Sequence, residues 1–152
     1  MLSRIIQKFR RSANRTPILT FAEKNLEAYS TTFLDVGARW GGGDAWWRLR
    51  SLVQYVGFDP DESECARLNS ATAKGRYESY EPFALGKERG TAKLYVASQP
   101  ACSSLFPPVP GLSNRYPNCA EIRTEKEVDV NLITLDEWWR ENKEPDISFI
   151  KL

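Results

Sequence analysis

The stretch that decides the fold is TTFLDVGARWGGG, residues 31–43, in which an apolar run ends in an acid and glycines follow. β-Branched and aromatic residues favour a buried strand, which we expect over Thr31–Val36. The glycines from Gly37 to Gly43 predict the turn that leaves this strand, because glycine adopts backbone conformations that other residues avoid. A strand that delivers an acid, here Asp35, to a glycine-rich turn is typical of a ligand-binding edge in an α/β sheet.

Further along the chain, strand patterns alternate with helix patterns. Strand patterns follow at Tyr55–Phe58, Phe83–Leu85, Thr91–Ala97, Glu127–Leu132 and Ile147–Leu152. A first helix is predicted over Ala45–Leu52, with Asp44 as its N-cap. A second begins at Asp61 or Ser63 as the cap and runs through Cys65, Leu68 and Asn69. A third is predicted over Leu135–Asn142, with Thr134 as its cap. The proline-rich segment Pro100–Pro117 predicts a long irregular loop. Strands that alternate with helices favour parallel pairing through right-handed crossovers, so the predicted class is α/β with a doubly wound, mostly parallel sheet.

The composition is that of one ordinary globular domain. The chain has 152 residues, 41% of them hydrophobic, and its 21 Lys and Arg balance 20 Asp and Glu. A net charge of +1 creates no broad field for nucleic acid, so we expect no nucleic-acid partner. The sequence lacks an uninterrupted apolar run of the roughly 18–20 residues that a membrane helix needs. We therefore expect a cytoplasmic protein with no integral membrane contact.

The N-terminal residues 1–15 predict a short basic amphipathic helix, with Leu2, Ile5, Ile6 and Phe9 at helical spacing and no acid among them. Such a helix can dock on a membrane surface or a partner. It can also pack its apolar side on the domain edge and leave its basic side in solvent, which is the more common arrangement. We therefore divide the chain into an N-terminal arm, residues 1–31, and a domain, residues 32–152.

The residue inventory limits the chemistry. The chain has three cysteines, which form no C-x-x-C pair, and no histidine, so we expect no metal site. The cysteines are expected to be small buried side chains in a reducing compartment. Any acid–base chemistry then falls to Asp, Glu, Lys, Tyr or Cys.

Two acids, Asp35 and Asp59, follow two successive predicted strands. The first belongs to the spacing Asp-x-Gly-x-x-x-Gly, formed with Gly37 and Gly41, rather than to the Gly-x-Gly-x-x-Gly pattern of dinucleotide binding. This spacing disfavours a pyrophosphate cradle, and the acid repels phosphate while suiting a cationic or amino-bearing ligand. The carboxylate of Asp59 can accept two hydrogen bonds from a ribose diol. Together the two acids indicate a nucleoside-type pocket.

Five stretches of the chain, in order, resemble the S-adenosylmethionine-dependent methyltransferases of the FkbM family. They are FLDVGARWGG, YVGFDPDESECARLN, FALGKERGTAKLYVASQPACSSLFPP, VNLITLDEW and DISFIKL, and they cover roughly residues 32–152. The resemblance implies a Rossmann-like methyltransferase fold, S-adenosylmethionine as cofactor, and O-methylation of a sugar, polyketide or other small-molecule acceptor.

The resemblance also implies roles for individual residues. It puts Asp35, Gly37 and Ala38 around the methionine part of the cofactor, with Gly41 ending the same turn, and Asp59 on the ribose hydroxyls. Pro60 and Asp61 would flank the adenine, and the Cys102, Ser103, Ser104 segment would lie at the pocket mouth, unless its hydroxyls only anchor a loop.

The C-terminus departs from the family pattern. Family members continue after FIKL with an acid and a short glycine turn that faces the active site, whereas Leu152 is the last residue here. We therefore expect a domain truncated at its C-terminus, the alternative being a naturally short protein that ends in an edge strand. No catalytic base is assigned, because the best candidate carboxylate would lie beyond Leu152.

Two other function classes fit the residues less well. A nicotinamide-dependent oxidoreductase would use the same acid after the second strand, but the glycine spacing disfavours it. A non-catalytic interaction module would expose an aromatic patch built from the five tryptophans, Trp40, Trp46, Trp47, Trp138 and Trp139. Paired tryptophans on helices more often pack into the core, so the methyltransferase is the function that the sequence favours.

Overall fold

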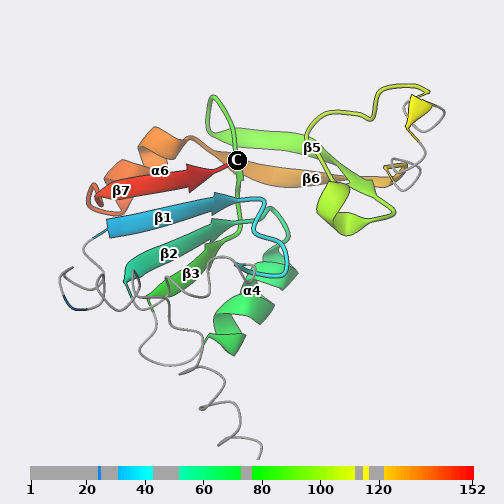
Figure 1. Ribbon diagram of the computed structural model, residues 1–152. Helices are drawn as coiled ribbons and strands as arrows, with labels where there is room; N and C mark the ends of the chain where they lie inside the picture. Colours follow the sequence, from blue (N-terminus) through cyan, green and yellow to red (C-terminus); the bar gives the residue numbers. More distant parts are fainter. Residues whose placement is uncertain (1–23, 25–30, 43–51, 73–76, 112–114, 117–121) are drawn as a thin grey trace, which may run out of the picture.

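The computed structural model describes residues 24, 31–42, 52–72, 77–111, 115–116 and 122–152. These residues form two sheets (Figure 1). The four-stranded sheet, in the order β3-β2-β1-β7, consists of β1 (Thr31–Val36), β2 (Val53–Phe58), β3 (Glu78–Glu81) and β7 (Ile147–Lys151). The three-stranded sheet, in the order β4-β6-β5, consists of β4 (Ala84–Leu85), β5 (Gly90–Ala97) and β6 (Thr124–Ile133). The helices are α4 (Glu62–Ala71), α6 (Leu135–Glu141) and the short 3₁₀ helix η1 (Pro100–Cys102).

The four-stranded sheet is parallel throughout and is packed on both faces. On one face, Phe33 and Tyr55 form a core cluster with Cys65 and Leu68 of α4. On the other face, the alternate residues of the same strands contact Trp138 of α6. Helices therefore cover opposite faces of a parallel sheet, and the predicted α/β class with a mostly parallel sheet is confirmed.

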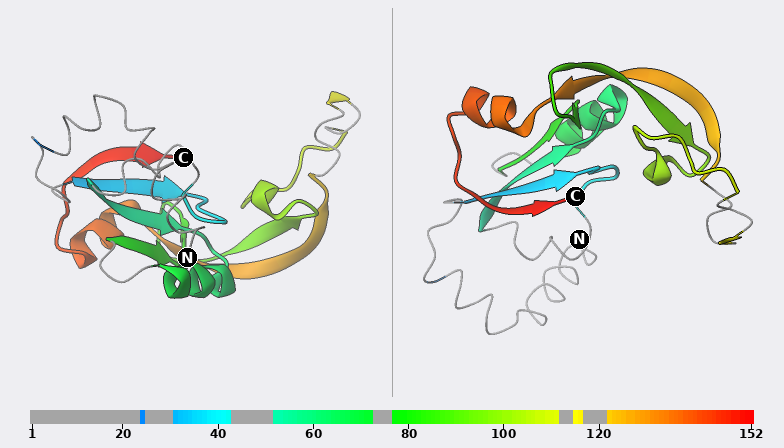
Figure 2. Two further views of the ribbon diagram at one scale, coloured as in Figure 1. Left: turned by 60° about the horizontal axis from the view of Figure 1, so that its bottom comes forward. Right: turned by 90° about the horizontal axis from the view of Figure 1, so that it is seen from above.

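The long strands β5 and β6 pair antiparallel and curve away from the parallel sheet as a ribbon (Figure 2). This pair departs from the parallel pairing that we expect from the sequence. β4 takes the parallel position on the other side of β6, with Ala84 opposite Leu132. The alternation of apolar and polar residues predicts a strand, but it carries no information about the direction of the partner strand.

Most predicted elements are confirmed with small changes of boundary. β1 has the predicted limits, and β2 begins two residues before the predicted start, at Val53. Asp61 caps α4, and Thr134 caps α6 through a reciprocal capping box with Glu137. β3 was not predicted, because Glu-Ser-Tyr-Glu has too few apolar residues to suggest a strand. The predicted basic helix over 1–15 and the predicted helix over Ala45–Leu52 lie outside the described residues, except for the buried Leu52.

The last strand, β7, lies at the edge of the sheet. The sequence analysis predicts a strand over Ile147–Leu152, and an apolar strand of this kind would be expected to be buried; the strand is present as Ile147–Lys151, but Phe149 is 49% exposed and only β1 pairs with β7 among the described strands. The strand is nevertheless held in register, since Phe149 stacks on Phe33 with ring centroids 5.1 Å apart. No helix in the described part of the chain is long and apolar enough to span a membrane.

Candidate functional site

The turn that leaves β1 is fastened to the end of β2. The N–H groups of Gly37 and Ala38 both donate to the carbonyl oxygen of Phe58, at 2.9 and 3.0 Å. Gly37 adopts a φ of +75°, in the left-handed region that favours glycine. Gly57 must also be glycine, because a Cβ there would lie 2.7 Å from the Cβ of Ala38. The carboxyl ends of the two strands therefore form one compact edge, as parallel α/β sheets present to ligands.

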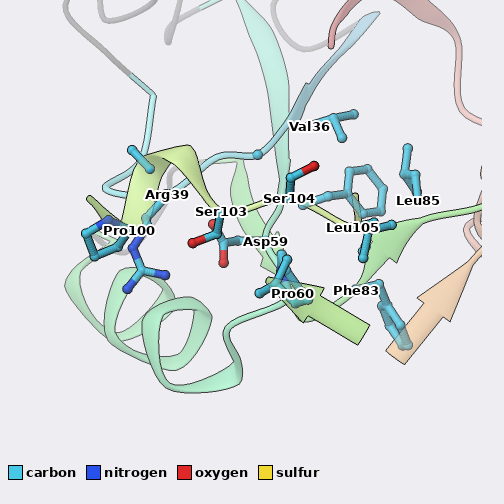
Figure 3. Close-up of a pocket in the computed structure, with 15 residues that line it drawn as sticks. Val36, Arg39, Asp59, Pro60, Phe83, Leu85, Pro100, Ser103, Ser104 and Leu105 are labelled. Carbon is cyan, nitrogen blue, oxygen red and sulfur yellow. The ribbon is translucent and has the colours of Figure 1, made fainter. Parts of the chain in front are cut away.

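A cavity of about 190 Å³ opens at this edge (Figure 3). Gly37, Arg39, Asp59 and Pro60, which follow β1 and β2, form one wall. Its other walls come from the segment after β3, from β5, and from η1 with the residues that follow it. The apolar members of those walls include Phe83, Leu85, Leu94 and Leu105. The cavity therefore joins the end of the parallel sheet to the β5–β6 ribbon, and apolar residues surround one carboxylate and one guanidinium.

Asp59 is only 4% exposed. Its Oδ1 accepts the N–H of Asp61 at 2.9 Å, and its own N–H donates to the carbonyl of Glu81 at 3.1 Å. The thiol of Cys65 donates to the Asp59 carbonyl at 3.2 Å. Burial raises the pKa of the Asp59 carboxyl above its ordinary value, and the nearby Arg39 guanidinium offsets part of that rise. Asp59 is thus a rigidly held acceptor in a poorly hydrated place.

Asp61 works as the N-cap of α4 rather than as part of the cavity wall. Its Oδ1 accepts the N–H groups of Ser63 and Glu64, both at 3.1 Å. Its Oδ2 accepts from Nη1 of Arg39 at 3.1 Å. Hydrogen bonds from Ser63, Glu64 and Arg39 hold the pKa of Asp61 below its ordinary value. The acid predicted to flank adenine therefore already has partners at both oxygens.

Asp35 lies beside the cavity without lining it. The Tyr55 hydroxyl donates to its Oδ2 at 2.7 Å, and Nζ of Lys151 pairs with its Oδ1. Burial, and then the hydrogen bond to Asp35, raise the pKa of Tyr55 well above its ordinary value. The predicted contact between Asp35 and the methionine part of a cofactor stays a prediction.

The remaining predicted residues divide between the cavity and its support. Gly37 and Pro60 line the cavity with Asp59, whereas Ala38 and Gly41 do not. Ala38 is buried in the core cluster that includes Phe33 and Tyr55. Gly41 adopts a φ of +82° beside the Tyr80 hydroxyl. The structure thus brings three of the predicted cofactor-binding residues, Gly37, Asp59 and Pro60, together at one cavity.

Residues of η1 and of the segment after it line the cavity. Ser103 and Ser104 line it, and Cys102 is exposed outside it, contrary to the expectation that all three cysteines are buried. The Ser103 hydroxyl accepts from the N–H of Ala97 at 3.2 Å, and that of Ser104 accepts from the N–H of Phe106 at 3.1 Å. Both hydroxyls anchor the loop, which is the simpler of the two roles considered for this segment.

Arg39 is a cavity residue that was not predicted from the sequence. Arg39 lines the cavity and pairs with Asp61, and its buried Nε has no hydrogen-bond partner among the described residues. The signal available in the sequence was a single basic residue within a turn of small residues next to the candidate acid. Within the described part of the chain, no three metal-ligating acids and cysteines come together.

The tryptophans are divided between core and surface. Trp138 is buried and packs edge-on against Phe58, with ring centroids 5.3 Å apart, as expected for core packing. Trp139 is half-buried and donates its indole N–H to the carbonyl of Pro145 at 3.0 Å. Trp40 is 57% exposed, and Trp46 and Trp47 lie outside the described residues.

Comparisons of this chain with models of known protein families, with curated proteins and with solved structures gave no match. The residues of the chain and the geometry of the cavity therefore carry the functional argument.

Proposed function

We propose that this chain binds S-adenosylmethionine at the cavity beside Asp59 and transfers its methyl group to a hydroxyl of a small molecule. The observation that carries the proposal is the buried Asp59, which directly follows β2, lines the cavity, and lies next to the turn at Gly37. An acid in this position of a parallel α/β sheet is suited to a ribose diol. The fold proposed within the α/β class is Rossmann-like, of the type that the FkbM motifs imply.

The size of the cavity limits what it holds. At about 190 Å³ it is smaller than the roughly 300–1,000 Å³ of typical ligand sites. We assign it to the nucleoside part of the cofactor, with the ribose at Asp59 and the adenine near Pro60. The apolar wall of Phe83, Leu85 and Leu94 suits a flat base.

The protein has a modest chemical task in this reaction. The bound cofactor supplies the electrophilic methyl group, and the chain must align it with the acceptor and exclude water. Asp59 would fix the ribose, and the bonds from Gly37 and Ala38 to Phe58 hold the neighbouring turn against the strand end. No residue of this chain is assigned as the base that removes the acceptor proton.

A calorimetric titration with S-adenosylhomocysteine tests the proposal. The wild-type chain is expected to bind, and Asp59→Asn is expected to weaken binding by roughly tenfold or more, since hydrogen bonds to a charged group are lost. Asp129→Asn is the matched control, because Asp129 is exposed on β6 outside the cavity. Wild-type protein that does not bind, or an Asp59→Asn variant that binds as tightly as the control, would overturn the proposal.

A further inference from the structure

Residues 106–110, with the sequence Phe-Pro-Pro-Val-Pro, form an exposed apolar segment that lies outside the cavity. Phe106 is 79% exposed and Val109 is 66% exposed. The chain leads away from the parallel sheet here, after η1 (Figures 1 and 2). Large apolar side chains that are exposed together mark a site of interaction.

Three prolines restrict the backbone of this segment to an extended, polyproline II-like conformation. A proline ring fixes its own φ at about −65° and keeps the residue before it out of the helical region. Pro107, Pro108 and Pro110 thereby restrict all five residues. Residues 107–109 accordingly belong to no helix, strand or turn, and no described backbone N–H donates to a carbonyl of residues 106–110. A polyproline II helix likewise has no internal hydrogen bonds.

The exposure of the segment repeats every three residues. Leu105 and Pro108 are half-buried, whereas the two residues that follow each of them are exposed. A polyproline II helix has three residues per turn, so residues three apart share one ridge. Phe106 and Val109 therefore share one outer ridge, and the two exposed prolines share the other. The inner ridge faces the protein, and its first member, Leu105, lines the cavity.

The segment is fastened at both ends. At one end, the N–H of Phe106 donates to the Ser104 hydroxyl at 3.1 Å, and Ser104 pairs with Tyr95 of β5 through two backbone hydrogen bonds. At the other end, Gly111 adopts a φ of +75° and its carbonyl accepts from the N–H of Arg115 at 3.3 Å. A segment that is already held in one conformation loses little entropy on binding.

The chemistry of the two outer ridges selects the partner. Their side chains are apolar, and the carbonyl groups of the segment can still accept hydrogen bonds. A groove lined with aromatic side chains fits this shape, because its rings pack between the ridges and its Tyr and Trp side chains can donate to the carbonyls. A membrane surface is a poorer fit, since such contacts use several basic residues and Arg115 is the only charged residue between Ser98 and Ala120.

We infer that residues 106–110 are a docking segment for a partner protein with an aromatic-lined groove of the kind that binds polyproline II helices. Phe106 and Val109 enter the groove along one ridge, and Pro107 and Pro110 enter it along the other. The inference does not depend on the proposed function, because none of these residues lines the cavity.

The test is a calorimetric titration of the whole chain with three isolated domains that have such grooves, an SH3, a WW and an EVH1 domain. At least one of them is expected to bind. Phe106→Ala and Val109→Ala are each expected to weaken that binding by roughly tenfold or more, as truncation of a buried apolar anchor does at other interfaces. Pro110→Ala is also expected to weaken it, because the second ridge loses a ring and the backbone loses a restraint.

Tyr77→Ala is the matched control, since Tyr77 is an aromatic residue that is 55% exposed and lies outside the segment, directly before β3. It is expected to bind the domains as the wild-type protein does. Thermal unfolding checks that each variant is folded. Sedimentation with vesicles of phosphatidylcholine and phosphatidylserine tests the membrane surface as the other occupant.

Four results would overturn the inference. The first is wild-type protein that binds none of the three domains at millimolar concentration. The second is binding that Tyr77→Ala weakens as much as Phe106→Ala does, which would indicate nonspecific apolar adhesion. The third is binding that Pro110→Ala leaves unchanged, which would indicate an apolar patch without polyproline II geometry. The fourth is sedimentation with the vesicles that Phe106→Ala abolishes, which would assign the segment to a membrane surface.

Discussion

The phenolic hydroxyl of Tyr55 on β2 donates a 2.7 Å hydrogen bond to Oδ2 of Asp35 on β1. The two strands are parallel neighbours, and Lys151 at the end of β7 pairs with the other oxygen of the same carboxylate. One residue from each strand beside β1 therefore donates a hydrogen bond to the buried carboxylate of Asp35. This arrangement links the edge strand β7 to the turn that borders the cavity.

Removal of the Tyr55 hydroxyl tests how much the network stabilises the fold. Tyr55→Phe keeps the ring that stacks on Phe33 but leaves Oδ2 of Asp35 without this donor. We expect the free energy of unfolding to fall by about 1.5–3 kcal/mol, the range for a hydrogen bond to a charged group. Urea unfolding measures the loss, and Tyr116→Phe, at an exposed position, should leave stability within about 0.5 kcal/mol. Equal stability of the two variants would contradict this role for Tyr55.

Substitution of Asp35 should mainly reduce stability, whereas substitution of Asp59 should mainly reduce ligand binding. Asp35→Asn breaks the pair with Lys151, whose side chain is 43% exposed and can turn into solvent. The expected loss is about 1–3 kcal/mol, below the ~3–5 kcal/mol for a fully buried pair. Under the proposed function, the variant should weaken S-adenosylhomocysteine binding less than Asp59→Asn does, because only Asp59 lines the cavity. The reverse order of the two affinities would mean that Asp35, rather than Asp59, makes the principal contact with the ligand.

The pH dependence of stability should carry opposite signatures from Asp59 and Asp61. Burial raises the pKa of Asp59 above its ordinary value of 3.8, so the folded protein holds that proton more tightly than the unfolded chain does. Its contribution to stability is therefore full below 3.8 and is lost as the pH rises through the raised pKa. The pKa of Asp61 is lowered from 3.8, so its contribution is present above 3.8 and is lost as the pH falls through the lowered pKa.

Urea unfolding between about pH 2 and pH 7 measures both effects. As the pH rises above 3.8, Asp59→Asn should gain stability relative to wild type. As the pH falls below 3.8, the difference between wild type and Asp61→Asn should shrink. Asparagine at position 61 still caps a helix, so the capping contribution is largely kept. For each variant, the stability difference from wild type is plotted against pH. If the two differences change in the same direction with pH, one of the two pKa shifts is wrong.

The packing of the β1 turn against β2 predicts a strong effect at Gly57. A Cβ at this position would lie 2.7 Å from both Ala38 and the Tyr80 ring, so Gly57→Ala should destabilise the fold by roughly 1–3 kcal/mol through overpacking. Gly90→Ala is the matched control, since a Cβ there meets nothing within 4 Å. Thermal unfolding compares the two. Similar melting temperatures would show that the edge can relax around an added methyl group.

Local signals account for the parts of the fold that were predictable. The β-branched run Thr31–Val36 forms a strand with the predicted limits, and Asp61 and Thr134 cap the helices that they were expected to cap. These features depend on side chains within a few residues of one another, which a sequence displays directly. The strand Glu78–Glu81 was missed because pairing with β2 stabilises it in spite of a polar sequence.

The sequence predicted where the candidate site lies in the fold, but not which residues contact one another there. Gly37, Asp59 and Pro60 reach one cavity because the ends of neighbouring parallel strands meet at one edge of a sheet. Asp61, expected to flank a ligand, instead caps α4, because the first free N–H groups of that helix lie within reach of its carboxylate. No local pattern distinguishes these two uses of an aspartate after a strand.

The sequence by itself determined that this chain forms an α/β fold with an acid at the end of each of its first two strands, because strand patterns, caps and glycine turns are set by neighbouring residues. Only the tertiary structure decided that Lys151 meets Asp35 and that Arg39 lines the same cavity as Asp59. The first contact depends on the register of β7 against β1, which joins residues far apart in the chain. The second depends on how the turn after β1 packs beside the cap of α4, and such packing is settled only when both elements are buried against the same sheet.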